Sequence, residues 1–124
     1  MKYLILFLLP AFLCAQNNRI RLESLPLDDG LSYQSVYALY QDSRGYLWIG
    51  TISGLIRYDG RNNTVFRHEP ENPHSLSHDD VVAIYEDEFK KIWIGTYGGG
   101  LNRYNPETGV FTRYLNDSTD TKSI

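Results

Sequence analysis

The chain repeats itself after 45 residues. The tetrapeptide Trp-Ile-Gly-Thr at residues 48–51 returns at residues 93–96, and residues 31–75 align with residues 76–123 around it. A repeat of this kind constrains the fold strongly, because each copy must form the same unit and the units must pack on one another. Positions with the same residue in both copies include Leu31/Leu76, Val36/Val81, Ala38/Ala83, Tyr40/Tyr85, Asp42/Asp87, Leu55/Leu101, Arg57/Arg103, Tyr58/Tyr104 and Phe66/Phe111.

Each repeat is predicted to form four short strands. Apolar, β-branched and aromatic residues gather in short runs that are separated by turn residues. The strands are expected at 36–41, 46–51, 55–58 and 65–68, and again at 81–86, 91–96, 101–104 and 110–114. A period of roughly 40–50 residues built from such strands is typical of a β-propeller blade, a small sheet that cannot bury its own faces. The predicted fold class is all-β, with two four-stranded antiparallel blades.

The two blades are expected to be a fragment of a larger ring. A closed propeller needs about 4–8 blades, and Ser123-Ile124 resembles the opening of a truncated third repeat. The expected organisation is a signal peptide at 1–15, an N-terminal strand segment at 16–30, blades at 31–75 and 76–123, and the start of a third repeat at 124. Residues 19–25 alternate polar and apolar residues, which predicts a strand that closes the ring. The alternative is an N-terminal arm that covers a sheet edge.

The first 15 residues have the layout of a secretory signal peptide. Lys2 precedes an apolar run at 3–13, and small residues lead into the polar stretch that follows. The run is too short to span a bilayer as a mature helix, so cleavage is expected after Ala15. An uncleaved anchor, or a lipid attached at Cys14, would be the alternatives. Cleavage would leave the mature part without cysteine, so its stability would rest on packing and not on disulfides.

The turn after the first strand of each repeat differs in one residue. Asp42-Ser43-Arg44-Gly45 has an aspartate that can bond backbone N–H groups and a glycine that accepts a positive φ. In the second repeat Lys90 replaces the glycine. Either the second turn is rearranged, or Lys90 carries backbone strain.

Two segments resemble a known repeat. The sequence AIYEDEFKKIWIGTYGGGLNRYN at 83–105, with a slightly degraded copy ALYQDSRGYLWIGTISGLIRYDG at 38–60, is similar to the two-component regulator propeller repeat. The resemblance implies the periplasmic sensor region of a hybrid two-component regulator, found in Gram-negative bacteria that degrade polysaccharides. In that family a β-sandwich, one membrane helix and cytoplasmic kinase, receiver and DNA-binding modules follow the blades. No kinase motif or phosphoacceptor occurs after residue 15, so this chain itself is expected to carry no phosphotransfer and not to be an enzyme. Histidine kinase activity would lie downstream in the full-length protein.

Most of the residues that could carry chemistry have a structural interpretation. Trp48 and Trp93 could stack on sugars, but their position within strands favours packing between blades. The glycines at 98–100 could cradle an anion, but a tight hairpin is favoured because the lysine of a phosphate loop is missing. The expected structural core of the repeat comprises Trp48, Gly50, Trp93, Gly95, Tyr58 and Tyr104.

A metal or acid–base site is not expected. His68, His74 and His78 lie close in sequence, but prolines break any helical register between them. In the run Glu86-Asp87-Glu88, the aspartate matches Asp42 as a turn former, and both glutamates are expected to be solvated. The prediction is therefore no catalytic residue, no metal and no cofactor.

Loop residues that differ between the repeats are the candidate ligand contacts. They are Tyr33, Tyr97, His78 and Asp79, which lie in loops that the propeller fold places at the mouth of the ring. Variation on a fixed frame suits blade-by-blade recognition, although ordinary loop drift explains it almost as well.

The leading functional hypothesis is an exported propeller sensor segment that recognises or transmits an extracytoplasmic signal. The expected partners are an oligosaccharide and the remaining blades of the same protein. The net charge of −3 argues against nucleic acid. The expected location is the periplasm, with tethering to the inner membrane by a downstream segment. The alternatives are an exported propeller enzyme acting on glycans and a secreted interaction propeller without signalling modules.

Overall fold

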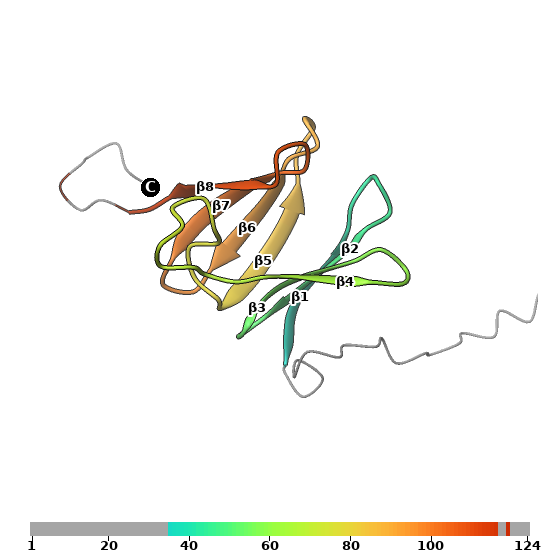
Figure 1. Ribbon diagram of the computed structural model, residues 1–124, viewed down its shortest axis with the longest axis horizontal. Helices are drawn as coiled ribbons and strands as arrows, with labels where there is room; N and C mark the ends of the chain where they lie inside the picture. Colours follow the sequence, from blue (N-terminus) through green and yellow to red (C-terminus); the bar gives the residue numbers. More distant parts are fainter. Residues whose placement is uncertain (1–34, 117–118, 120–124) are drawn as a thin grey trace, which may run out of the picture.

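The chain forms two small sheets (Figure 1). The computed structural model describes residues 35–116 and 119. The predicted signal peptide, the closing strand at 19–25, Tyr33 and the third repeat at 124 lie outside the described residues. Within the described part the secondary structure is all strand, and no helix that could cross a membrane is found there.

Each repeat provides one antiparallel four-stranded sheet in which the strands follow chain order. The first sheet has strands β1 (Val36–Gln41), β2 (Leu47–Thr51), β3 (Gly54–Tyr58) and β4 (Asn63–Phe66). The second has β5 (Val81–Glu86), β6 (Ile92–Thr96), β7 (Gly100–Asn105) and β8 (Val110–Tyr114). The all-β prediction is therefore confirmed, and the predicted strands agree with the observed ones except at the end of the first repeat.

The strand predicted at 65–68 is displaced towards the N-terminus. The Asp59 carboxylate accepts hydrogen bonds from the N–H groups of Arg61 and Asn62, which closes a tight turn and brings Asn63 opposite Tyr58. At the other end, the His68 N–H donates to the Asp79 carboxylate at 2.6 Å and leaves the sheet. Side-chain acceptors on both sides therefore set the bounds of β4 at Asn63–Phe66.

The β1–β2 and β5–β6 turns have the same structure. One oxygen of Asp42 accepts the N–H groups of Arg44 and Tyr46, both at 2.9 Å. Asp87 does the same for the N–H groups two and four residues on. Gly45 has a φ of 91° and Lys90 a φ of 61°. The second turn is therefore not rearranged, and Lys90 adopts the left-handed conformation that favours glycine.

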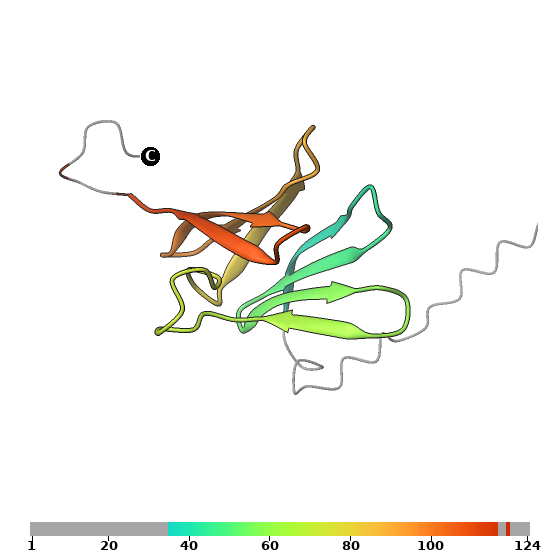
Figure 2. The same ribbon diagram turned by 45° about the horizontal axis from the view of Figure 1, so that its top comes forward.

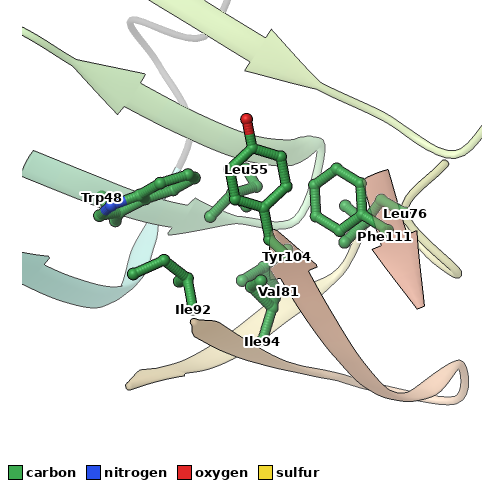
Figure 3. Close-up of a cluster of buried hydrophobic side chains, with 8 residues drawn as sticks. All are labelled: Trp48, Leu55, Leu76, Val81, Ile92, Ile94, Tyr104 and Phe111. Carbon is green, nitrogen blue, oxygen red and sulfur yellow. The ribbon is translucent and has the colours of Figure 1, made fainter. Parts of the chain in front are cut away.

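The two sheets pack face to face, with β1 beside β5 (Figures 1 and 2). Successive side chains of a strand point to opposite faces, so Trp48 and Ile49 lie on different sides of the first sheet. The face that carries Trp48 meets the face of the second sheet that carries Ile92 and Ile94 (Figure 3). The buried residues of this junction are Trp48, Leu55, Leu76, Val81, Ile92, Ile94, Tyr104 and Phe111.

Aromatic rings fill the centre of the junction. Trp48 lies edge-on to Tyr104 with ring centroids 5.4 Å apart, and it stacks on Phe66 at 5.9 Å. Tyr104 and Phe111 follow at 4.8 Å. These rings come from both sheets, so neither sheet can form this core without the other.

Gly50 allows the second sheet to approach the first. A Cβ at this position would lie 2.7 Å from Val81 Cγ1 and 3.0 Å from the Val81 carbonyl oxygen. A Cβ at the equivalent Gly95 would meet only the Ala83 Cβ, at 3.3 Å. The glycine of the repeated tetrapeptide therefore lies in close contact with the following blade, wherever such a blade is present.

Candidate functional site

The linker between the blades, residues 67–80, is held in one shape by hydrogen bonds around Ser75. The buried Ser75 hydroxyl accepts the Glu69 N–H at 2.9 Å and lies 2.9 Å from the Asn72 carbonyl oxygen. Arg113 of β8 donates from Nε to the Ser75 carbonyl oxygen at 2.9 Å and from Nη2 to that of Asn72 at 3.0 Å. The second blade therefore holds the linker that leads into it.

The second half of the linker is anchored by a buried amide. The Asn102 Oδ1 accepts the Ser77 N–H at 3.0 Å, and its Nδ2 donates to the Ser77 hydroxyl at 2.8 Å. The equivalent position of the first blade is Ile56. Sequence reasoning did not select Asn102. The signal was present, because a polar residue replaces an isoleucine between two otherwise matching positions.

The linker and the β6–β7 hairpin meet at one end of the second blade (Figure 1). The Tyr97 N–H donates to the Asp80 carbonyl oxygen at 2.8 Å. Gly99 is buried against the linker, since a Cβ there would overlap the Cβ of His78 and lie 2.7 Å from Thr96 Oγ1. The structure therefore brings Tyr97 and His78, two predicted ligand contacts, to the same end of the blade.

The predicted contacts differ in how free they are to meet a ligand. The Tyr97 side chain is 73% exposed. His78 is exposed, and its Nδ1 accepts the Asp80 N–H at 3.2 Å. Asp79 is half-buried, and its carboxylate accepts the His68 N–H. A phenol, an imidazole and turn backbone can exchange hydrogen bonds with a hydroxylated ligand, whereas Asp79 already organises the linker.

Among the residues that the structure describes, no group of three or more His, Cys, Asp or Glu side chains could hold a metal ion. The His68 ring lies against the linker, with its Nδ1 2.8 Å from the Leu76 carbonyl oxygen. The His74 carbonyl oxygen accepts the Phe111 N–H at 3.0 Å. These two histidines take part in the contact between the linker and the blades.

The tryptophans of the repeat are held by the turn aspartates. Trp48 Nε1 donates to Asp42 Oδ2, and Trp93 Nε1 donates to Asp87 Oδ2, both at 2.8 Å. Trp48 is 1% exposed and lies in the junction, so it cannot serve as a sugar platform. Trp93 is half-buried in the equivalent position of the second blade.

The Asp87 carboxylate is stabilised as an anion. Burial alone would raise its pKa, but the hydrogen bonds from the Trp93 indole and from the N–H groups of Lys91 and Phe89 outweigh that effect, so the pKa of Asp87 is lowered. In Asp59, hydrogen bonds from the N–H groups of Asn62 and Arg61 also lower the pKa. Both aspartates therefore act as charged acceptors in turns.

An arginine lies opposite each tryptophan on the next strand of the sheet. The Arg57 guanidinium lies 5.8 Å from the Trp48 ring and 4.9 Å from the Tyr46 ring, and its Nη1 donates to the Tyr104 hydroxyl of the second blade at 3.3 Å. Arg103 lies 5.8 Å from the Trp93 ring. The Trp–Arg pair thus stabilises the sheet and, at the first junction, links two blades.

The prediction that Glu86 is solvated was wrong. Its carboxylate accepts the Ser43 N–H and the Ser43 hydroxyl, each at 2.9 Å, and lies 4.0 Å from Arg44 Nη1. The Glu86 side chain is only 10% exposed. The β1–β2 turn of the first blade directs these donors towards β5 of the second blade. The Glu86 carboxylate at the end of β5 accepts their hydrogen bonds. Glu88, by contrast, is exposed.

Comparison with known proteins agrees with the assignment of the two sheets as β-propeller blades. The model of the family described as "Two component regulator propeller" matches residues 30–53 and 75–98, each of which ends just after a Trp-Ile-Gly-Thr tetrapeptide. The predicted resemblance is confirmed, because the family model matches each of the two repeats.

Similar proteins are much longer than this chain. The extracellular domain of a putative hybrid two component system from B. thetaiotaomicron is 31% identical, with a TM-score of 0.72, over 82% of this chain and 14% of that structure. The extracellular domain of a putative one component system from the same organism is 33% identical, with a TM-score of 0.59, over 73% and 13% of the two chains. "Histidine kinase P4" of Formosa agariphila is 43% identical over 58 residues, which are 47% of this chain and 4% of that protein.

Proposed function

We propose that this chain is a segment of an exported propeller sensor in a hybrid two-component regulator. In this role its blades take part in recognising an extracytoplasmic signal or in passing it towards the membrane. The observation that carries the proposal is the likeness of the two packed blades to the extracellular domain of a putative hybrid two component system, over 82% of this chain. The similarity to a protein named histidine kinase supports the same assignment.

The proposed ligand is an oligosaccharide, and the proposed contacts in this segment are Tyr97 and His78. Tyr97 and His78 are both exposed at the same end of the second blade, and the bond from the Tyr97 N–H to the Asp80 carbonyl oxygen fixes the loops that carry them. Aromatic rings stack on the apolar faces of sugars, while imidazole and backbone groups bond sugar hydroxyls. Asp79 would hold the linker in place, and Tyr33 would contribute from the equivalent loop of the first blade. The proposed role of this segment is binding without catalysis.

A thermal-shift experiment on the full extracytoplasmic region tests the proposal. A panel of oligosaccharides is added, and a ligand present at about 100 times its Kd should add about 2.7 kcal/mol to the free energy of unfolding. Tyr97→Ala and His78→Ala should reduce this shift. Glu107→Ala serves as the control, because Glu107 is exposed in the β7–β8 turn at the opposite end of β7.

The outcome of this experiment separates the proposed sensor from its alternatives. If no oligosaccharide of the panel shifts the transition, the proposed ligand class is wrong. If the region converts an oligosaccharide into shorter products, it is an exported enzyme. Fusion of alkaline phosphatase after Ile124 tests export separately, because the enzyme is active only outside the cytoplasm, and an inactive fusion would contradict the periplasmic location.

A further inference from the structure

The second blade presents a face whose counterpart in the first blade is covered. Tyr85 and Trp93 occupy the positions of Tyr40 and Trp48. Tyr85 is 62% exposed, Trp93 is half-buried, and Phe89 in the adjoining turn is 74% exposed. If the repeat continues as the proposed function requires, this face receives the next blade.

At the first junction, the β1–β2 turn of the first blade has hydrogen-bond donors that need an acceptor from the next blade. The Ser43 N–H and hydroxyl both donate to the Glu86 carboxylate, and the Arg44 guanidinium reaches the same carboxylate and the Lys90 carbonyl oxygen. One acceptor at the end of β5 therefore satisfies donors from the preceding blade. Because Glu86 is the last residue of β5, the equivalent residue of any following blade will meet the β5–β6 turn.

The β5–β6 turn has the same backbone but different side chains. Its hydrogen bonds match those of the β1–β2 turn in pairing and length. The Glu88 N–H therefore points as the Ser43 N–H does, towards the position of the next blade. The side chains there are a carboxylate at Glu88 in place of the serine hydroxyl, and an apolar ring at Phe89 in place of a guanidinium.

A carboxylate like that of Glu86 would lose one donor at this second junction, because Glu88 replaces the serine whose hydroxyl donates to Glu86. It would accept the Glu88 N–H, but the negative charge of the Glu88 side chain would oppose it, because like charges at short range are destabilising. A side-chain amide meets both requirements, because its oxygen accepts the N–H and its NH₂ group donates to the carboxylate. Gln41 occupies this position at the end of β1, which shows that the repeat accommodates an amide there.

We propose that the exposed face of the second blade binds a further blade of the same protein whose first strand ends in an amide side chain, glutamine or asparagine, instead of a carboxylate. This inference rests on the proposed function, because it requires the propeller to continue. The Phe89 ring then packs against apolar surface of that blade, and Tyr85 contacts its first strand as Tyr40 contacts Tyr85, with ring centroids 6.1 Å apart.

The experiment measures the thermal unfolding of the full extracytoplasmic region with Glu88→Lys and with Glu107→Lys as the matched control. Lysine at 88 removes the acceptor for the amide NH₂, so Glu88→Lys should lower the Tm more than Glu107→Lys does. An unchanged or raised Tm for Glu88→Lys would overturn the inference, since it would indicate a partner that is apolar or acidic.

Oxidative footprinting of the same protein separates this inference from the proposed function. Trp93 and Tyr85 should be protected, while Tyr97 is oxidised. If both are protected but Glu88→Lys is neutral, the propeller continues and only the amide is wrong. If Trp93 is oxidised as readily as Tyr97, no blade covers it and the proposed continuation fails. Protection that appears only at high protein concentration would assign the face to a second copy and would also overturn the inference.

Discussion

The Asp42 carboxylate joins the β1–β2 turn to the blade junction, because one of its oxygens holds the turn and the other accepts the Trp48 indole N–H at 2.8 Å. The aspartate is buried beside the ring that fills the junction. The same pair recurs as Asp87 and Trp93. In each blade the aspartate therefore fixes the orientation of the tryptophan ring six positions later. The same aspartate also closes the turn in which it lies.

Replacement of Asp42 by alanine should destabilise the propeller by about 2–3 kcal/mol, since it leaves a buried indole N–H without an acceptor and opens the turn. Chemical denaturation of the full extracytoplasmic region measures the change. Asp59→Ala is the control, because Asp59 closes an exposed turn without a tryptophan, and it should cost at most about 1.5 kcal/mol. Equal losses for the two variants would contradict the role of the Asp42–Trp48 bond.

Truncation of either tryptophan to alanine should cost about 3–5 kcal/mol in the complete protein. For Trp48 the reason is present in the structure, since the ring contacts Phe66 and Tyr104. For Trp93 the cost depends on the next blade. A melting temperature that does not change on Trp93→Ala would show that this ring is not part of a blade junction.

The two glycines of the repeated tetrapeptide should respond differently within the first junction. Gly50→Ala should cost about 1–3 kcal/mol, because the added Cβ would overlap Val81 and force the blades apart. Gly95→Ala provides the comparison in a fragment that contains both blades, and it should be milder, since only the Ala83 Cβ is near. A milder effect at Gly50 than at Gly95 would contradict the observed approach of β5.

Acid should weaken the β5–β6 turn through Asp87. The pKa of Asp87 is lower in the folded protein than its ordinary value of 3.8. A lowered folded pKa contributes stability that is present above 3.8 and is lost as the pH falls through the folded value. Urea midpoints measured from about pH 6 down to about pH 3 should therefore fall less steeply in Asp87→Asn than in the unchanged protein. Parallel curves would show that Asp87 does not contribute to the acid sensitivity.

The mature N-terminus should lie at Gln16 or a neighbouring residue. The apolar run at 3–13 after Lys2 motivates this prediction. Mass spectrometry of the protein from the envelope fraction provides the measurement, and a retained Met1 would contradict removal of the leader.

The strands could be predicted because local signals and the repeat agree. Turn residues separate the apolar runs, and each strand of one copy supports the assignment of its partner. The end of β4 was predicted too late, because Asp79, eleven positions further on, captures the His68 N–H. The role of Glu86 was missed for a similar reason, since its partners Ser43 and Arg44 belong to the other repeat.

The candidate site was predictable in part. Tyr97 and His78 could be selected because they differ between the repeats, and the structure places both at one end of the second blade. The anchoring of the linker by Asn102 and Arg113 was not predicted. These contacts join residues 25 and 38 positions apart, and a pattern along one strand carries no signal for them.

The junction between the blades has a direction. A tryptophan-bearing face meets an isoleucine-bearing face, so the two surfaces in contact are different. A two-fold axis would bring like faces together and could not reproduce this contact. Addition of units through this contact therefore continues in one sense around an axis, and only an isoleucine-type face can complete the circuit by receiving the last tryptophan-type face. Such an assembly ends when its first unit is reached, so its size depends on the angle between neighbouring units and not on a special terminal surface.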